Sequence, residues 1–120
     1  MELTEKQQEL LMRRNLVVLA TSSLDGQPRA IIVEVNKAEG ETLVITDNEM
    51  NETRNNLLAN GKVSILAFEE DYSFCFKIFG VAKYCQSGEY YDFAKNLETN
   101  KKEVPKGAVV IAIDKVIEFK

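Results

Sequence analysis

The stretch NLVVLATSSLDGQPRAIIVEVNKAEGETLVIT, residues 15–46, decides the fold. The pairs Asp25-Gly26 and Glu39-Gly40 divide it, and pairs of this kind form the tight turns that join antiparallel strands. Between the turns lie three runs of apolar and β-branched residues, at positions 16–21, 29–36 and 42–46. The stretch therefore predicts three consecutive antiparallel strands.

Three further runs continue this pattern toward the C-terminus, at positions 63–68, 73–85 and 108–119. Gly80 lies within the longest run, where a strand glycine usually marks a bend or a close backbone approach. Six strands joined mostly by tight turns, with short helices at the start and at two crossings, are typical of a small antiparallel β-barrel. We therefore expect a mainly β fold with short helices. Because 120 residues suit one hydrophobic core, we expect residues 1–120 to form a single domain.

Helix signals appear at three places outside the strands. Thr4 and Gln7 have the spacing of a capping box, which predicts a helix over residues 5–14. Asn60 followed by Gly61 is a C-terminal helix signal, so the segment before it is expected to be helical. Ser87 is expected to cap a third helix, whose apolar stripe would be Tyr90, Phe93 and Leu97.

Composition excludes several classes of function. The formal net charge is -4 and no run of Lys or Arg occurs, so a nucleic-acid surface is not expected. No apolar stretch approaches the roughly 18 residues that a membrane helix needs, and the N-terminus lacks signal-peptide features. We therefore expect a soluble, cytoplasmic protein with no membrane partner. The chain has no His, which excludes His-based catalytic triads and His-ligated metals, and we expect neither a catalytic protein residue nor a metal site.

Cys75 and Cys85 both fall in the predicted strand 73–85. Ten residues of strand separate their Cα atoms by roughly 33 Å. This distance is far beyond disulfide reach, so we expect two free thiols in a reducing compartment.

A polar segment, TDNEMNETRNN, follows the strand that ends at residue 46. Two interpretations compete for it. Asn and Asp side chains cap helices by accepting hydrogen bonds from free backbone amides. Alternatively, a phosphate or another anion sits on those amides at the positive end of the helix dipole. The second interpretation requires Asp47, Glu49 and Glu52 to point away from the anion.

The order of these features resembles the FMN-binding split-barrel family related to pyridoxamine 5'-phosphate oxidase, and most closely its small FMN-binding members. The resemblance rests on VVLATSSLDGQPRAIIVEV, LVITDNEMNETRNNLLANGKVSILAF and KIFGVAKY, and it covers most of the chain. It implies a six-stranded antiparallel split β-barrel. It also implies a homodimer in which FMN lies in a groove between the subunits.

The resemblance further assigns cofactor-binding residues. In the family, the strand-to-helix junction holds the FMN phosphate, and here this junction comprises Thr46, Asn51, Thr53 and Arg54. The flavin ring lies along the second strand and near the backbone that follows the third strand, which here means Ile32, Val33, Glu34, Asp47 and Asn48.

One departure from the family concerns a cation. Family members commonly carry a Lys at or next to the position of Thr53, where this chain has Glu52 and Thr53. Arg54 is the local cation that could replace this Lys, with an ion pair to Asp47 or Glu49 as its alternative role. Arg29 is a second cation that could reach the phosphate, or it could simply face solvent.

Strand alternation suits a ligand or a subunit interface on one face of residues 29–36. One face carries Ile31, Val33 and Val35 and is expected to fill the barrel. The other face carries Ala30, Ile32 and Glu34, and a single carboxylate among small or apolar residues fits a flat ligand, an interface or plain solvent exposure. Three aromatic residues elsewhere are expected to serve core or dimer packing: Phe74, Phe76 and Tyr84.

We therefore expect a small FMN-binding flavoprotein, either an electron carrier or an oxidoreductase acting on an unidentified small molecule or redox-protein partner. FMN would carry the redox chemistry, so no protein acid or base is needed. Oxidation of pyridoxamine phosphate itself is not favoured, because no arginine-rich segment is present for a second phosphorylated ligand. Two alternatives remain. In the first, the same barrel binds another ligand, either a deazaflavin or a haem held through Met or Cys. In the second, the barrel is a cofactor-free interaction or stress-response module, and Glu52 is the residue that supports this alternative.

Overall fold

The computed structural model of the protein describes residues 2–100 and 103–120. The predicted strands and helices are present within these residues, with bounds that differ by a few positions. In chain order the elements are α1 (Glu5–Arg14), β1 (Leu16–Ser22), β2 (Pro28–Glu39), β3 (Thr42–Asp47), α2 (Glu52–Ala59), β4 (Lys62–Phe68), β5 (Cys75–Cys85), α3 (Glu89–Lys95), the 3₁₀ turn η1 (Glu98–Asn100) and β6 (Gly107–Glu118).

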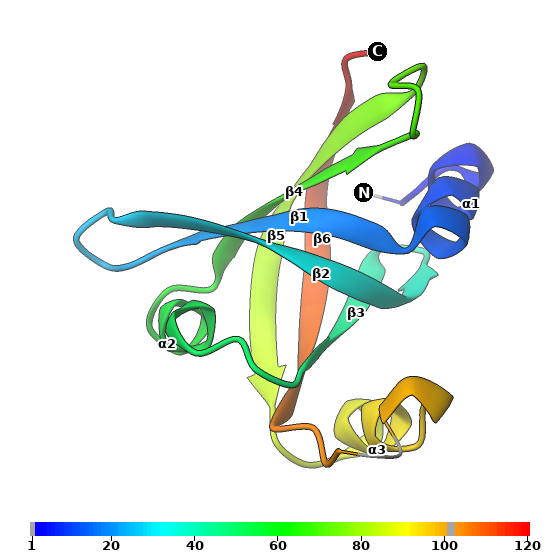
Figure 1. The fold of residues 1–120 in the computed structure, drawn as a ribbon. Coiled ribbons are helices and arrows are strands. Elements are labelled where there is room, and N and C mark those ends of the chain that lie inside the picture. Colours follow the sequence, from blue (N-terminus) through cyan, green and yellow to red (C-terminus); the bar gives the residue numbers. More distant parts are fainter. Residues whose placement is uncertain (1, 101–102) are drawn as a thin grey trace.

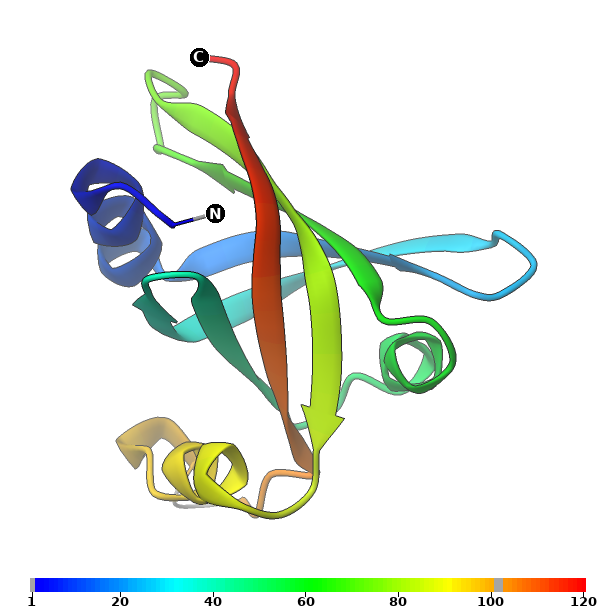
Figure 2. The same cartoon turned by 180° about the vertical axis from the view of Figure 1, so that it is seen from behind.

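The strands close into an antiparallel barrel in the order β1-β2-β3-β6-β5-β4 (Figure 1). Two pairings join strands that are far apart in the chain, β3 with β6 and β1 with β4. The helices lie around the outside of this barrel, as the view from behind also shows (Figure 2). The predicted six-stranded antiparallel split-barrel fold is thus confirmed. In the described part of the chain, no helix is long and apolar enough to cross a membrane.

β2 is paired unevenly along its two edges, and this opens the barrel. Its first half, up to Glu34, pairs with β1. Its second half pairs with β3, and this pairing begins where Val35 lies opposite Ile45. Beyond Ile45, the last residues of β3, Thr46 and Asp47, are paired with β6, while β2 and β3 diverge (Figure 1). We call this opening between β2 and β3 the split.

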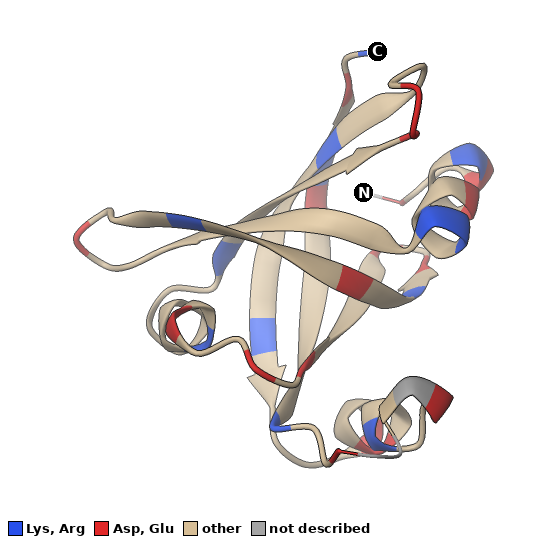
Figure 3. Ribbon diagram, in the orientation of Figure 1, with Lys and Arg blue, Asp and Glu red and all other residues tan. Residues whose placement is uncertain are grey.

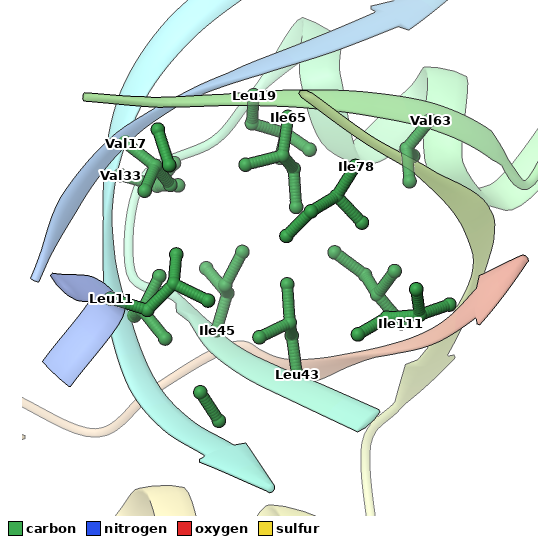
Figure 4. Close-up of a cluster of buried hydrophobic side chains, with 14 of the residues drawn as sticks. Leu11, Val17, Leu19, Val33, Leu43, Ile45, Val63, Ile65, Ile78 and Ile111 are labelled. Carbon is green, nitrogen blue, oxygen red and sulfur yellow. The ribbon is translucent and has the colours of Figure 1, made fainter. Parts of the chain in front are cut away.

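The barrel interior is filled by alternate residues of the strands. On β2, Val33 and Val35 are buried while Ile32 is 72% exposed, so the predicted alternation is confirmed. Phe74 and Phe76 are also buried, as expected for core packing. Figure 4 shows side chains from all six strands and α1 pointing toward one another, among them Leu11, Val17, Leu19, Val33, Leu43, Ile45, Val63, Ile65, Ile78 and Ile111.

Two local predictions are confirmed in detail. At the start of α1, the N–H of Gln7 donates to Thr4 Oγ1 at 3.1 Å, and the N–H of Thr4 donates to Gln7 Oε1 at 2.9 Å, which completes the capping box. Gly80 marks a close backbone approach, because an added Cβ would lie 2.3 Å from the backbone oxygen of Ala112 on β6. The strand register shifts at this glycine.

The predictions for α3 are wrong in two respects. Ser87 does not cap the helix, because the N-cap is Gly88 with φ +94° and no side chain makes a capping hydrogen bond there. Glycine adopts this backbone conformation freely, whereas residues with a Cβ rarely do. The predicted stripe also fails, since α3 ends at Lys95 and Leu97 lies beyond it. Ala94 is the residue of α3 that is buried.

Candidate functional site

A groove follows the split between β2 and the loop that joins β3 to α2. One part, the helix end, has a volume of about 480 Å³ and is lined by residues 28–31 and 49–53. The other part, the amide end, has a volume of about 260 Å³ and is lined by residues 31–34, Asn36, Thr46, residues 48–50 and Asn100. Ile31, Glu49 and Met50 line both parts, so the two parts adjoin along the split.

The helix end is built around the first residues of α2. Asn51 occupies the N-cap position with φ 51° and ψ -110°, and its side chain makes no capping hydrogen bond. The side chain of Asn51 therefore does not cap α2. Thr53 is 1% exposed, and its backbone N–H donates to the carbonyl oxygen of Met50 at 3.1 Å. Of the four residues assigned to the phosphate, Asn51 and Thr53 lie at this end, where Asn51 is exposed and Thr53 is enclosed in the groove wall. Thr46 lies at the amide end instead.

Charged side chains of both signs line the helix end. Arg29 extends from β2, while Glu49 and Glu52 lie in the loop and at the start of α2, where Figure 3 marks acidic positions. Arg29 Nη2 lies 3.9 Å from Glu52 Oε2, and both side chains are exposed. Glu49 and Glu52 thus face the groove, so the requirement that the acidic residues point away is met only by Asp47.

Asp47 lies in a buried charged cluster outside the groove lining. Its carboxylate, with 0% exposure, accepts hydrogen bonds from Arg54 Nε and Nη2 and from the hydroxyl of Tyr84. It also accepts from the backbone N–H of Met50 at 2.9 Å. We call Asp47, Arg54 and Tyr84 the carboxylate cluster. Arg54 is therefore held by Asp47, the alternative considered for it, and it does not line either part of the groove.

Mutual hydrogen bonding sets the protonation states of the carboxylate cluster. Burial alone would raise the pKa of Asp47, but the hydrogen bonds from Arg54, Tyr84 and Met50 outweigh it and hold the pKa below its ordinary value. Burial, together with the neighbouring carboxylate, raises the pKa of Tyr84 to about 12. At neutral pH the cluster thus combines a carboxylate, a guanidinium and a neutral phenol. Through Met50, it fixes the loop to the end of β3.

The floor of the amide end consists of four linked side chains, which we call the amide network: Asn36, Thr46, Asn48 and Asn100. Asn100 Nδ2 donates to the backbone oxygen of Ala94 at 2.8 Å and to Thr46 Oγ1 at 3.2 Å. The Thr46 hydroxyl donates to Asn36 Oδ1 at 2.7 Å, and Asn48 Nδ2 donates to Asn100 Oδ1 at 3.1 Å. Asn48 Oδ1 is buried and has no hydrogen-bond partner among the described residues.

Sequence reasoning missed two members of this network. Asn36 carried a signal, since it lies two positions after Glu34 and would share its face of the strand. The register shift between Val35 and Lys37 marks a bulge at this position, and bulges often re-aim side chains at sites. Asn100 carried no comparable signal, because it belongs to η1 and only the folded barrel brings it to the end of β3.

Neither metal ligation nor a disulfide is found in the described residues. They contain no group of three His, Cys, Asp or Glu side chains placed to hold a metal ion. Cys75 and Cys85 are both free and lie at opposite ends of β5.

Comparison with known proteins identifies the family. Residues 3–120 match the family named pyridoxamine 5'-phosphate oxidase. The chain belongs to this family. A relative in Methanocaldococcus jannaschii, the uncharacterized protein MJ0282, is 35% identical over 125 residues, which cover 99% of this chain and 82% of the relative.

Solved structures share nearly the whole fold. HupZ of Group A Streptococcus has a TM-score of 0.88 and 24% identity, with 98% of this chain and 94% of HupZ covered. An FMN-binding protein from Syntrophomonas wolfei subsp. wolfei has a TM-score of 0.76 and 15% identity, with 96% and 85% covered. HutZ, the heme storage protein from Vibrio cholerae, has a TM-score of 0.74 and 14% identity, with 98% and 94% covered. At these identities the likeness shows the fold alone.

Proposed function

We propose that the chain is a small FMN-binding flavoprotein that acts as an electron carrier or as an oxidoreductase on a small molecule or a redox-protein partner. The observation that carries this proposal is the elongated groove in the split. Its helix end combines the start of α2 with a guanidinium, and its amide end has a neutral hydrogen-bonding floor. Membership of the pyridoxamine 5'-phosphate oxidase family and the shared fold of the Syntrophomonas FMN-binding protein support the same ligand.

The helix end suits the phosphate of FMN. Backbone amides at the start of α2 and the positive end of its dipole favour an anion at this place. We propose that Asn51 and Thr53 border the phosphate and that Arg29 supplies the nearby positive charge.

The amide end suits the flavin ring. The exposed side chain of Ile32 offers an apolar contact along β2, and Val33 and Glu34 border the same part of the groove. Thr46 and Asn48 belong to the polar floor, which can meet the hydrogen-bonding edge of the ring. When bound, FMN supplies the electron-transfer chemistry, and the chain's residues hold the ring, orient it and restrict water.

Asp47 and Arg54 serve the groove indirectly in this proposal. Their ion pair and the hydrogen bond from Met50 keep the loop in the shape that lines the groove. To reach a phosphate, Arg54 would have to leave a buried carboxylate, and an unpaired buried charge is costly. We therefore assign the positioning of the loop to Arg54 and the direct cationic contact to Arg29.

The side-chain charges at the helix end limit the expected affinity. Glu49 and Glu52 oppose an anion, and Arg29 offsets one of the two charges. Both carboxylates are exposed, so water and salt screen their repulsion. We expect FMN binding that depends more on backbone amides and on the ring than on side-chain cations.

We also propose a homodimer. Ile32 lies opposite Val18 on β1, and Val18 lies opposite Leu66 on β4, so an outward apolar row crosses three strands. It continues into an apolar hollow of about 470 Å³ that includes Phe68 and Phe119. A second subunit on this face would cover apolar surface and close the groove from outside. Sedimentation of the purified protein as a monomer at micromolar concentration would contradict a groove shared between two subunits.

The free thiols of Cys75 and Cys85 support a reducing, cytoplasmic location.

The alternative ligands use the same groove. HutZ shares the fold, so haem is a competitor, but the chain has no His and would have to offer another ligand such as Met50, which lines both parts of the groove. A deazaflavin has the same ring edge as FMN and competes on equal terms at the amide end. A cofactor-free module is the remaining alternative, and Glu52 at the helix end is the residue that favours it.

An absorption spectrum and a titration test this proposal. We expect the purified protein to carry or take up oxidised flavin, seen as a two-band visible spectrum, and to quench FMN fluorescence with saturation at one flavin per subunit. A Soret band after purification, or saturable binding of hemin without binding of FMN, would instead establish the haem alternative. No binding of any of these ligands would favour the cofactor-free module.

A further inference from the structure

We infer that Asn48 Oδ1 selects the ligand of the groove by accepting a hydrogen bond from an N–H donor at the edge of a flat heterocycle. For FMN this donor is N3–H of the pyrimidine edge. The inference rests on the proposed function and extends it, because it names one protein atom that separates ligands with such a donor from ligands without one.

The direction of every hydrogen bond in the amide network follows from one backbone carbonyl. The backbone oxygen of Ala94 can only accept, so the group of Asn100 that lies 2.8 Å from it must be the amide nitrogen. The other side-chain atom of Asn100 is then its oxygen, which faces Asn48. A flipped Asn100 would set oxygen against oxygen at Ala94. This amide orientation is therefore fixed by the fold.

The orientation of Asn48 follows in turn. Asn100 Oδ1 can only accept, so Asn48 must present its Nδ2 to it, at 3.1 Å. The Oδ1 of Asn48 is the atom left over, and it has no partner among the described residues. Turning the Asn48 amide over would bring two oxygens together and break the network. The unpaired group of the floor is thus an acceptor and not a donor.

A buried hydrogen-bond acceptor without a partner is unusual in a folded protein. Buried polar atoms in folded proteins are nearly always hydrogen-bonded, because leaving one unpaired forfeits its hydration. Asn48 Oδ1 is the one buried side-chain nitrogen or oxygen without a partner in the described part of the chain, and its residue lines the amide end. A ligand whose N–H reaches this atom supplies the hydrogen bond that the described residues do not. A ligand that brings a carbonyl or a methyl group is rejected.

This requirement divides the candidate ligands. FMN and deazaflavins present an imide N–H between two carbonyls at the end of the ring away from the benzene-type edge. Haem presents no N–H at its edge, since its pyrrole nitrogens bind the iron. The amide end therefore favours the flavin-type ligands. With the phosphate at the helix end, the ring is bound with its pyrimidine edge toward Asn48.

The test compares FMN with 3-methyl-FMN, in which a methyl group replaces the N3 hydrogen. Dissociation constants are measured by fluorescence quenching for the parent protein, for Asn48→Leu and for Asn55→Leu. Asn55 is an exposed residue of α2 that lines neither part of the groove, so it serves as the matched amide-to-Leu control. Thermal unfolding and the far-ultraviolet circular dichroism spectrum establish that each variant is folded.

We expect the parent protein and Asn55→Leu to bind FMN at least about tenfold more tightly than 3-methyl-FMN, the usual scale for losing one buried hydrogen bond. In Asn48→Leu the two flavins should bind within about twofold of each other. Equal affinity of the parent for both flavins would overturn the inference while leaving the proposed FMN binding intact, and this comparison needs no variant to fold. If FMN itself does not bind, both the proposed function and the inference fail.

Discussion

Thr46 and Asp47 are neighbours at the end of β3, yet their side chains enter two clusters of opposite character. Asp47 is buried in the carboxylate cluster, where charges of both signs meet and its carboxylate accepts several hydrogen bonds. Thr46 joins the amide network, which carries no charge and ends in the unpaired Oδ1 of Asn48. A polar cluster whose groups are all paired stabilises the fold, whereas one with an unpaired acceptor is suited to recognition.

The contrast predicts that substitutions in the two clusters differ in what they change. Loss of the carboxylate cluster should lower the free energy of unfolding. Loss of the amide network should mainly lower ligand affinity.

Asp47→Ala should lower the free energy of unfolding by about 2–4 kcal/mol, because it leaves Arg54, a partly buried side chain with 23% exposure, without its partner. Urea unfolding monitored by circular dichroism at neutral pH measures this change. Asp114→Ala, on the exposed face of β6, is the matched control and should stay within about 0.5 kcal/mol of the parent. A loss below 1 kcal/mol for Asp47→Ala would mean that the cluster is not a main support of the fold.

The ion pair of Asp47 also predicts that the free energy of unfolding decreases at acidic pH. The pKa of Asp47 is lowered in the folded protein, so its contribution is present above the unfolded pKa of about 4 and is lost as the pH falls through the lower folded value. The difference in free energy of unfolding between the parent and Asp47→Ala should therefore shrink as the pH is lowered below about 4. A difference that stays constant down to the acid transition would contradict the assignment of the charge to Asp47.

Tyr84→Phe should cost about 1 kcal/mol, since it removes one hydrogen bond to a buried carboxylate. The substitution should also change how the free energy of unfolding depends on pH in the alkaline range. The pKa of Tyr84 is raised to about 12, so its contribution is complete below the unfolded value of about 10 and disappears as the pH rises through about 12. Spectrophotometric titration of the phenols should show a late titration step in the parent that is missing in Tyr84→Phe.

Thr46→Val should change stability by about 1 kcal/mol or less but weaken FMN binding by about tenfold, because it removes the link that orients Asn36 and Asn100 in the groove floor. Parallel urea unfolding and FMN titration measure the two effects. The comparison between the clusters fails if Thr46→Val destabilises the protein as much as Asp47→Ala while leaving FMN affinity unchanged.

Arg29→Gln should have the smallest effect on stability, within about 0.5 kcal/mol, because its contact with Glu52 is long and exposed. FMN affinity should fall by about tenfold and depend less on salt, since a charge contact at the phosphate is lost. Glu52→Lys should act in the opposite direction and raise affinity. If Arg29→Gln binds FMN as the parent does at low and high salt, the phosphate is held without this arginine.

Most of the fold could be predicted because its signals are local. The Asp25-Gly26 turn, the capping box at Thr4 and the alternation along β2 each depend on residues a few positions apart, and each is realised. The prediction for Ser87 failed although its signal was also local. A glycine in a backbone conformation that other residues avoid took the cap position, and sequence alone does not show that conformation.

The candidate site was predictable only where it lies along one strand or one turn. Ile32, Thr46 and Thr53, which the family resemblance assigns to FMN, line the groove, and their contact with FMN stays a prediction. The partner of Arg54 could not be decided in advance, because Asp47 and Glu49 both lie a few positions before it in the chain. Tyr84, the third member of the carboxylate cluster, meets Asp47 only through the pairing of β3, β6 and β5. Asn100 is likewise brought to Thr46 by the fold and not by any local pattern.

The split also determines how these barrels can associate. A closed ring of paired strands offers no template for strand addition, but the first half of β2 is paired with β1 on one side and borders the groove on the other. Such a backbone edge is where foreign strands attach and amyloid-like stacking begins. Pro28 removes one amide donor from this edge, and the charges of Arg29 and Glu34 disfavour a flat apolar neighbour. The split can therefore admit a ligand, while the edge of β2 resists pairing with a strand from another molecule.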